Sequence, residues 1–194
     1  MTNTATPAAA PLWVFGYGSL IWNPEFPVAE RRLARAPGWR RRFCMWSIHH
    51  RGTPEAPGLV LALDAAPGGG CDGVALRVAP GAEAETLIAL RERELISSAY
   101  LERWIGVRLA DGAAAEALAF VIDRAHAQYC GNLDLETQAR VIAGACGGRG
   151  PNCEYLWQTA RHLAELGIPD PDLEWLGQRV AILRAADGAE GPGK

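Results

Sequence analysis

The sequence is poor in cysteine, and the cysteines that it has are not arranged for disulfide bonding. The five cysteines of this 194-residue chain are an odd number, lie far apart and form no Cys-x-x-Cys motif. A small secreted domain carries an even number of cysteines at short spacings, so this distribution argues against a disulfide framework and favours a reducing compartment. We therefore expect a cytoplasmic protein.

Long hydrophobic runs are also absent. No segment approaches the ~18–20 consecutive apolar residues that a membrane-spanning helix requires, so we expect no association with a membrane. The start of the chain is rich in threonine, alanine and proline, and it lacks the basic and apolar regions of a signal peptide. We expect residues 1–11 to be disordered, residues 12–185 to form one domain and residues 186–194 to form a flexible tail.

The chain has no excess of basic side chains. Its 19 lysines and arginines are opposed by 22 aspartates and glutamates, which gives a formal net charge of -3 at pH 7. Affinity for nucleic acid comes largely from neutralising phosphates, so we expect no nucleic-acid partner. The basic cluster Arg40–Arg42 runs into an apolar segment and indicates a strand edge or a small anion site. Nothing in the sequence indicates an obligate protein partner.

Histidines are few, and metal-binding motifs are missing. The four histidines form no His-Glu-x-x-His motif and no Cys/His spacing typical of zinc. We expect neither a metal site nor a cofactor. Cys44 lies near His49 and invites a thiol-nucleophile interpretation, but it stands inside an apolar segment, where a packed thiol is more typical.

What the sequence does contain is a series of apolar, β-prone runs separated by glycine and proline. These runs predict strands at residues 13–15, 42–48, 58–63, 73–78, 104–109 and 117–122. The segment Pro67–Gly70 is expected to form a loop between the third and fourth strands. Asp111-Gly112 is expected to connect the last two as a hairpin.

Helices are expected mostly after the strands. One helix is predicted over residues 82–97, and the chain from Leu135 onward is predicted to be helical, with breaks near Gly147–Pro151 and Pro169–Pro171. Strands come mostly first and helices mostly last, without strict alternation, which favours an α+β fold.

The first predicted strand ends in the glycine-rich turn Gly16-Tyr17-Gly18-Ser19. A dinucleotide fingerprint would need a further glycine where the chain has Ile21, a phosphate loop would need Gly-Lys-Ser/Thr, and a nucleophile elbow would need Gly-x-Ser-x-Gly. Two interpretations remain. The segment is either a plain tight turn, or a turn whose backbone N–H groups hold a carboxylate or a developing oxyanion.

The helix predicted over residues 82–97 carries a carboxylate on its apolar side. At about 100° per residue, an apolar arc is formed by Ala84, Leu87, Ile88, Leu90 and Leu95. Glu94 and Arg91 fall inside this arc, whereas Glu92 points away from it. Glu94 is therefore either a functional carboxylate or a buried charge that pairs with a basic residue at the helix end.

Four segments together resemble the ChaC-type γ-glutamylcyclotransferases, in the glutathione-specific branch. In order they are residues 14–24 (VFGYGSLIWNP), residues 50–55 (HRGTPE), Arg93-Glu94 with Tyr100 downstream, and Gly150-Pro151-Asn152-x-Glu154-Tyr155-Leu156. The resemblance runs from about Trp13 to Val180. It implies a small mixed β-barrel surrounded by helices, which agrees with the α+β interpretation.

The resemblance also implies which residues act. The family's catalytic acid corresponds to Glu94, since Tyr100 follows at the expected distance and the competing Glu92 points off the apolar arc. The family's substrate loop corresponds to Val14, Phe15, Gly16, Tyr17, Gly18, Ser19 and Leu20. Arg51, Tyr100 and Tyr155 are either contacts of the substrate or of Glu94, or structural residues.

The implied reaction converts glutathione to 5-oxoproline and cysteinylglycine with no cofactor. The γ-glutamyl α-amine attacks its own side-chain carbonyl, Glu94 accepts the ammonium proton, and the glycine-rich turn binds either the α-carboxylate or the oxyanion. Two alternatives stay open at this point. One is a cyclotransferase for other γ-glutamyl amines or amino acids, and the other is a non-catalytic regulatory protein linked to cation transport.

Overall fold

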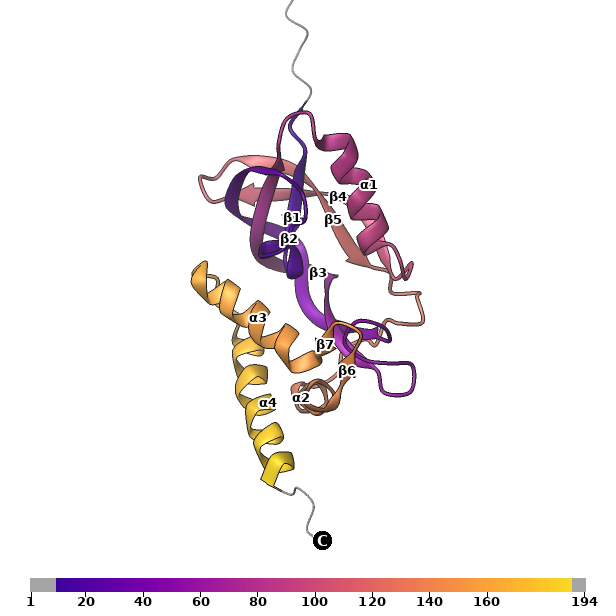
Figure 1. The fold of residues 1–194 in the computed structure, drawn as a ribbon. Coiled ribbons are helices and arrows are strands. Elements are labelled where there is room, and N and C mark those ends of the chain that lie inside the picture. The colour runs from indigo at the N-terminus through magenta and orange to yellow at the C-terminus, as the bar shows by residue number, and fades with distance from the viewer. Residues whose placement is uncertain (1–9, 190–194) are drawn as a thin grey trace, which may run out of the picture.

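The computed structural model describes residues 10–189, so our expectations for residues 1–9 and 190–194 lie outside it (Figure 1). The elements in chain order are β1 (Trp13–Gly16), a 3-10 turn (Ser19–Ile21), β2 (Val28–Ser47), β3 (Gly58–Val78), α1 (Glu83–Glu94), β4 (Tyr100–Leu109), β5 (Ala114–Ile122), α2 (Leu135–Gly144), β6 (Cys146–Gly147), β7 (Gly150–Pro151), α3 (Asn152–Glu165) and α4 (Pro171–Ala189). Residues 186–189, which we expected in the C-terminal tail, are therefore helical.

The five long strands close into a barrel in the order β1-β3-β2-β4-β5. Strand β1 is antiparallel to β3 but parallel to β5, which makes the barrel mixed. Fully buried side chains such as Val14, Leu76 and Leu118 fill it, because the apolar residues of adjacent strands face inward. The predicted α+β fold with a small mixed β-barrel is confirmed.

Strands β2 and β3 are longer than we predicted, because a proline-glycine segment bends them without ending them. Pro37 pairs with Gly70 and Trp39 pairs with Ala65, so residues 66–69 bulge out opposite Gly38. The expected loop at Pro67–Gly70 is thus a bulge inside one long strand. Gly38 adopts a φ of 79°, a left-handed conformation that glycine adopts without strain.

Each arginine of the basic cluster in β2 forms an ion pair within the protein. Arg40 and Arg41 contact Asp172 and Asp170 at the start of α4, at 2.7 and 2.9 Å, and Arg42 contacts the buried Asp64 at 3.3 Å. The strand interpretation of this cluster is correct, and its charges are neutralised within the fold.

The helices lie in two places around the barrel. Helices α2, α3 and α4 pack together at one end of it, whereas α1 lies along its side and leads from β3 into β4 (Figure 1). No helix in the described part of the chain is long and apolar enough to cross a membrane. The C-terminal end of α1 and the N-terminal end of α3 approach the same barrel mouth, and this is where the principal cavity lies.

Candidate active site

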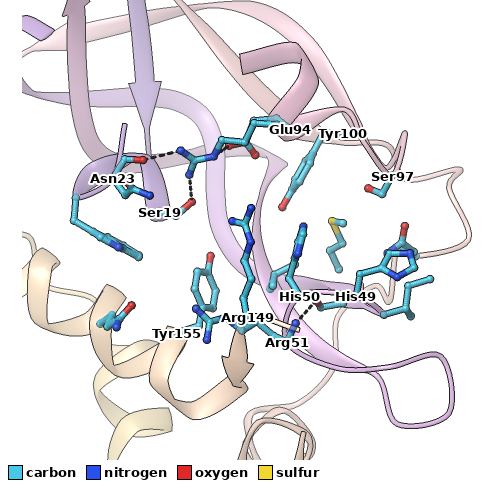
Figure 2. A pocket seen from close by; sticks show the side chains of 18 residues that line it. Ser19, Asn23, His49, His50, Arg51, Glu94, Ser97, Tyr100, Arg149 and Tyr155 are labelled. Atoms are coloured by element: carbon cyan, nitrogen blue, oxygen red, sulfur yellow. Dashed lines mark hydrogen bonds and ion pairs between the residues drawn. The ribbon is translucent and has the colours of Figure 1, made fainter. Parts of the chain in front are cut away.

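A cavity of about 320 Å³ opens between the end of α1, the turn after β1 and the segment that precedes α3 (Figure 2). It is lined by Ser19, Trp22, Asn23, Met45, Ser47, Ile48, His49, His50, Arg51, Val60, Arg93, Glu94, Ser97, Tyr100, Gln128, Arg149, Tyr155 and Gln158. The four family-like segments are separated by long stretches of chain, yet the fold brings residues of all four to these walls.

A smaller recess of about 40 Å³ adjoins this cavity. It is lined by Tyr17, Gly18, Ser19, Leu20, Leu61, Glu94, Tyr100, Phe120 and Tyr155. Ser19, Glu94, Tyr100 and Tyr155 line both spaces, so cavity and recess form one site. Glu94 stands at the junction between the open cavity and the recess beneath the glycine-rich turn.

Glu94 faces the cavity and pairs with Arg93, as one of the two interpretations predicts, whereas its catalytic role stays a prediction. Its side chain is only 17% exposed, and the Nε of Arg93 lies 3.0 Å from its Oε1. Burial raises the pKa of the Glu94 carboxyl above its usual range, although the positive charges of Arg93 and Arg149 act in the opposite direction. A carboxylate with a raised pKa is suited to accept and return a proton.

The predicted apolar arc of α1 is wrong in part. Ile88 is 57% exposed and Ala84 is exposed, whereas Thr86 and Leu90 are buried. Arg91, expected to face inward, is exposed and pairs with Glu102 on β4 at 2.7 Å. The buried face of α1 is therefore rotated relative to the predicted apolar arc. Arg91 lies outside this face, where Glu102 is its ion-pair partner.

Arg93, rather than Arg91, is the inward-facing arginine of α1, and its sequence position alone predicts no role for it. Its guanidinium donates to the carbonyl of Asn23 at 2.7 Å and to the Oγ of Ser19 at 2.9 Å, and it lies 3.1 Å from Glu25. These contacts tie the end of α1 to the turn after β1. Arg93 therefore fixes the position of Glu94 relative to that turn.

The predicted substrate loop divides into two parts. Val14 and Phe15 are fully buried inside the barrel, and neither they nor Gly16 line the cavity or the recess. Tyr17, Gly18, Ser19 and Leu20 do line the recess. A Cβ at Gly18 would lie 3.3 Å from the Tyr155 hydroxyl, so the glycine leaves room for that phenol. Figure 2 shows Tyr155 near Ser19.

Arg51, Tyr100 and Tyr155 all reach the site. The Tyr100 hydroxyl donates to the carbonyl of Leu61 at 2.8 Å. Burial raises the pKa of Tyr155 to about 12, so its phenol stays protonated at neutral pH. The Arg51 guanidinium lies 5.7 Å from the centre of the Tyr155 ring and donates to the carbonyl of Pro151 at 3.1 Å.

Cys44 is a packed thiol. It is fully buried, and burial raises its pKa to about 12, which leaves the unreactive thiol form at neutral pH. Within residues 10–189, no group of three or more His, Cys, Asp or Glu side chains is placed to hold a metal ion. The side chains that line the cavity and the recess include one carboxylate, three arginines and three phenols.

Comparison with known proteins agrees with this arrangement. The family model described as ChaC-like protein matches residues 12–183. The chain is 36% identical to the glutathione-specific gamma-glutamylcyclotransferase of Escherichia coli K12, over 98% of this chain and 81% of that protein. It is 33% identical to gamma-glutamylcyclotransferase 2-3 of Arabidopsis thaliana, over 87% and 88% of the two chains.

A solved structure carries the same fold. The crystal structure of the yeast gamma-glutamyl cyclotransferase specific to glutathione superposes with a TM-score of 0.82, at 24% identity, over 90% of this chain and 97% of that one. With the family match spanning nearly all of the folded chain and the predicted carboxylate at the mouth of the same barrel, the protein belongs to the ChaC-like family.

Proposed function

We propose that this protein is a γ-glutamylcyclotransferase that converts glutathione to 5-oxoproline and cysteinylglycine. The observation that carries the proposal is the position of Glu94, a mostly buried carboxylate between an open cavity and a smaller recess. The relatives named for this reaction on glutathione support the choice of substrate. We place the reaction in the cytoplasm, because all five cysteines are free thiols.

The reaction requires a neutral α-amine. An α-amino group has a pKa of ~8 and an ordinary glutamate a pKa of ~4.3, so transfer of the ammonium proton to glutamate is uphill by roughly 5 kcal/mol. Burial raises the pKa of Glu94 and so narrows this gap. The freed amine attacks the γ-carbonyl, and the closing five-membered ring makes the attack intramolecular.

Glu94 then returns the proton. As the tetrahedral intermediate collapses, the bond between the γ-carbon and the cysteine nitrogen breaks. The departing nitrogen takes the proton held by Glu94 and the second proton lost by the attacking nitrogen, so the dipeptide leaves with a charged amine. The products are the cyclic amide and a free dipeptide amine, so no water is consumed. One carboxylate thus serves as base and then as acid.

The recess holds the γ-glutamyl end in this proposal. Backbone N–H groups of Tyr17–Leu20 at the start of the 3-10 turn bind the α-carboxylate or the oxyanion, since such groups have no partner within the turn itself. Val14, Phe15 and Gly16 act from inside the barrel by holding this turn in place. Arg93 and the phenol of Tyr155 complete the walls beside Glu94.

The decisive experiment is to incubate the purified protein with millimolar glutathione and measure 5-oxoproline and cysteinylglycine.

We expect Glu94→Gln to lower turnover by about 10²- to 10⁴-fold while the protein stays folded, since glutamine cannot accept the proton. Glu92→Gln is the matched control, because Glu92 is exposed on the same helix. Normal activity in Glu94→Gln together with loss in Glu92→Gln would place the base two residues earlier.

The products separate cyclisation from hydrolysis. N-acetyl-glutathione lacks a nucleophilic amine, so we expect no cleavage of it. Free glutamate as the primary product from glutathione would contradict the proposal even if Glu94 were essential. Turnover of γ-glutamyl-alanine as fast as that of glutathione would widen the substrate to other γ-glutamyl compounds.

A further inference from the structure

Three arginines line the main cavity, and two of them are already engaged. Arg93 contacts the Asn23 carbonyl, Ser19 and two carboxylates, and Arg51 contacts the Pro151 carbonyl and the Tyr155 ring. The third is Arg149, whose side chain makes no hydrogen bond or ion pair with any residue in the described range 10–189. Arg149 thus offers an uncommitted guanidinium to the cavity.

Arg149 lies on the opposite wall from Glu94, and Figure 2 shows it extending into the cavity beside Tyr155 and His50. It does not line the recess. The positive charge of Arg149 opposes the rise that burial causes in the pKa of Glu94, and it adds to the effect of burial in lowering the pKa of His50. A substrate that reaches Glu94 from the open cavity therefore passes this guanidinium.

The turn that carries Arg149 is firmly held. The backbone N–H groups of Gly148 and Arg149 donate to the carbonyls of His49 and His50 at 2.8 and 2.9 Å. The buried side chain of Asn152 accepts from the N–H of Leu59 at 2.6 Å and donates to its carbonyl at 2.7 Å. These contacts fasten the β6–β7 turn to the barrel, so the guanidinium projects from a fixed backbone.

Glutathione carries a glycine carboxylate that neither the recess nor Glu94 accounts for. In the proposed function, its α-ammonium faces Glu94 and its α-carboxylate or oxyanion faces the turn after β1. The glycine carboxylate lies roughly 10 Å further along an extended tripeptide, outside the recess and in the larger cavity. A carboxylate there matches the planar, two-pronged donor geometry of a guanidinium.

We propose that Arg149 binds the glycine carboxylate of glutathione and thereby distinguishes the tripeptide from γ-glutamyl compounds that lack it. This inference rests on the proposed function. It assigns to Arg149 a contact with the part of the substrate that leaves as cysteinylglycine, away from the reacting atoms. Arg149 therefore acts mainly on KM, whereas Glu94 acts on kcat.

The test compares glutathione with its glycinamide, in which the glycine carboxylate is replaced by an uncharged amide. We expect Arg149→Gln to raise KM for glutathione by about 10- to 100-fold, the size of a lost charge-assisted hydrogen bond, with kcat changed less than about threefold. For the glycinamide, the unaltered protein should already show the raised KM, and Arg149→Gln should add little to it.

The controls separate recognition from folding. Arg140→Gln removes an exposed arginine of α2 and should leave KM unchanged for both substrates. Arg149→Lys keeps the charge without the two-pronged geometry and should give an intermediate KM. An equal rise in KM for glutathione and glycinamide, or equal KM values for the two substrates with the unaltered protein, would overturn the proposal. Absence of 5-oxoproline formation by the unaltered protein would instead refute the proposed function.

Discussion

Glu94 is the residue on which folding and chemistry place opposite demands. A mostly buried carboxylate is costly for the fold when it is ionised, yet the proposed reaction needs the ionised form to accept a proton. Arg93, 3.0 Å away, stabilises the ionised form, while burial opposes it and has the larger effect on the pKa of Glu94. The folded protein is thus less stable with an ionised Glu94 than it would be with a neutral side chain at this position.

The Glu94→Gln substitution should therefore stabilise the protein at neutral pH while abolishing activity. The folded-state pKa of Glu94 lies above the unfolded value, so its contribution to stability is fully present below the unfolded pKa of ~4.3 and is lost as the pH rises through the folded pKa. The unaltered protein loses this contribution on the way to neutral pH, whereas a glutamine side chain never ionises. Each unit of pKa difference corresponds to about 1.4 kcal/mol in the free energy of unfolding.

Urea unfolding at pH 7 measures this difference directly. The exposed Glu92→Gln variant supplies the baseline for replacing a carboxylate by an amide on α1. A lower free energy of unfolding for Glu94→Gln than for the unaltered protein would show that the ion pair with Arg93 outweighs the cost of burial.

At the scale of elements, the β6–β7 turn depends on Gly147, which lets its backbone pack directly against the backbone of residues 50–52. A Cβ at Gly147 would lie 2.4 Å from the backbone nitrogen of Gly52 and 2.6 Å from the carbonyl carbon of His50. Both neighbours are backbone atoms, which cannot rotate aside. The turn must therefore move away from the His49–Gly52 segment if any side chain is added there.

Gly147→Ala should consequently weaken both the fold and the site. We expect the free energy of unfolding to fall by about 1–3 kcal/mol, as for other overpacked positions, and kcat/KM for glutathione to fall by about tenfold or more. Thermal unfolding and initial rates measure the two effects. Gly144→Ala is the control: a Cβ there meets nothing within 4 Å, and alanine favours the helix, so stability and activity should be kept.

Elements with a strong local pattern were predictable from the sequence, and those that depend on distant partners were not. The hairpin around Asp111-Gly112 and the helical last third follow from turn residues and periodicity, and both are confirmed. The first half of β2 is not predictable from the sequence, because its arginines look like a solvated loop until the distant Asp111 and Asp72 are placed beside Arg32 and Arg35.

The site shows the same division. Glu94 was found because its helical position and its Arg-Glu pair agree, and the turn at 17–20 because its motif is contiguous. The sequence around Arg149, Gly-Gly-Arg-Gly, predicts only an interruption between helices and indicates no function for the arginine. Its role depends on the hydrogen bonds to His49 and His50 that aim it into the cavity, and no local sequence pattern encodes them.

At the scale of the whole molecule, the proposed reaction uses only protein side chains and backbone. The described residues contain no cluster of three or more His, Cys, Asp or Glu side chains suited to a metal ion. We therefore expect turnover of glutathione to be unchanged after dialysis against EDTA. Loss of activity that zinc or magnesium restores would contradict a mechanism based on Glu94 alone.

The walls of the cavity come from segments that lie far apart in the sequence, which has a consequence for how the protein is made. Ser19 and Trp22 leave the ribosome well before Arg149, Tyr155 and Gln158. A nascent chain that already contains Glu94 still lacks one wall of its site. The proposed activity on glutathione therefore requires synthesis of the chain through Gln158, and a nascent chain that stops before Arg149 should lack it.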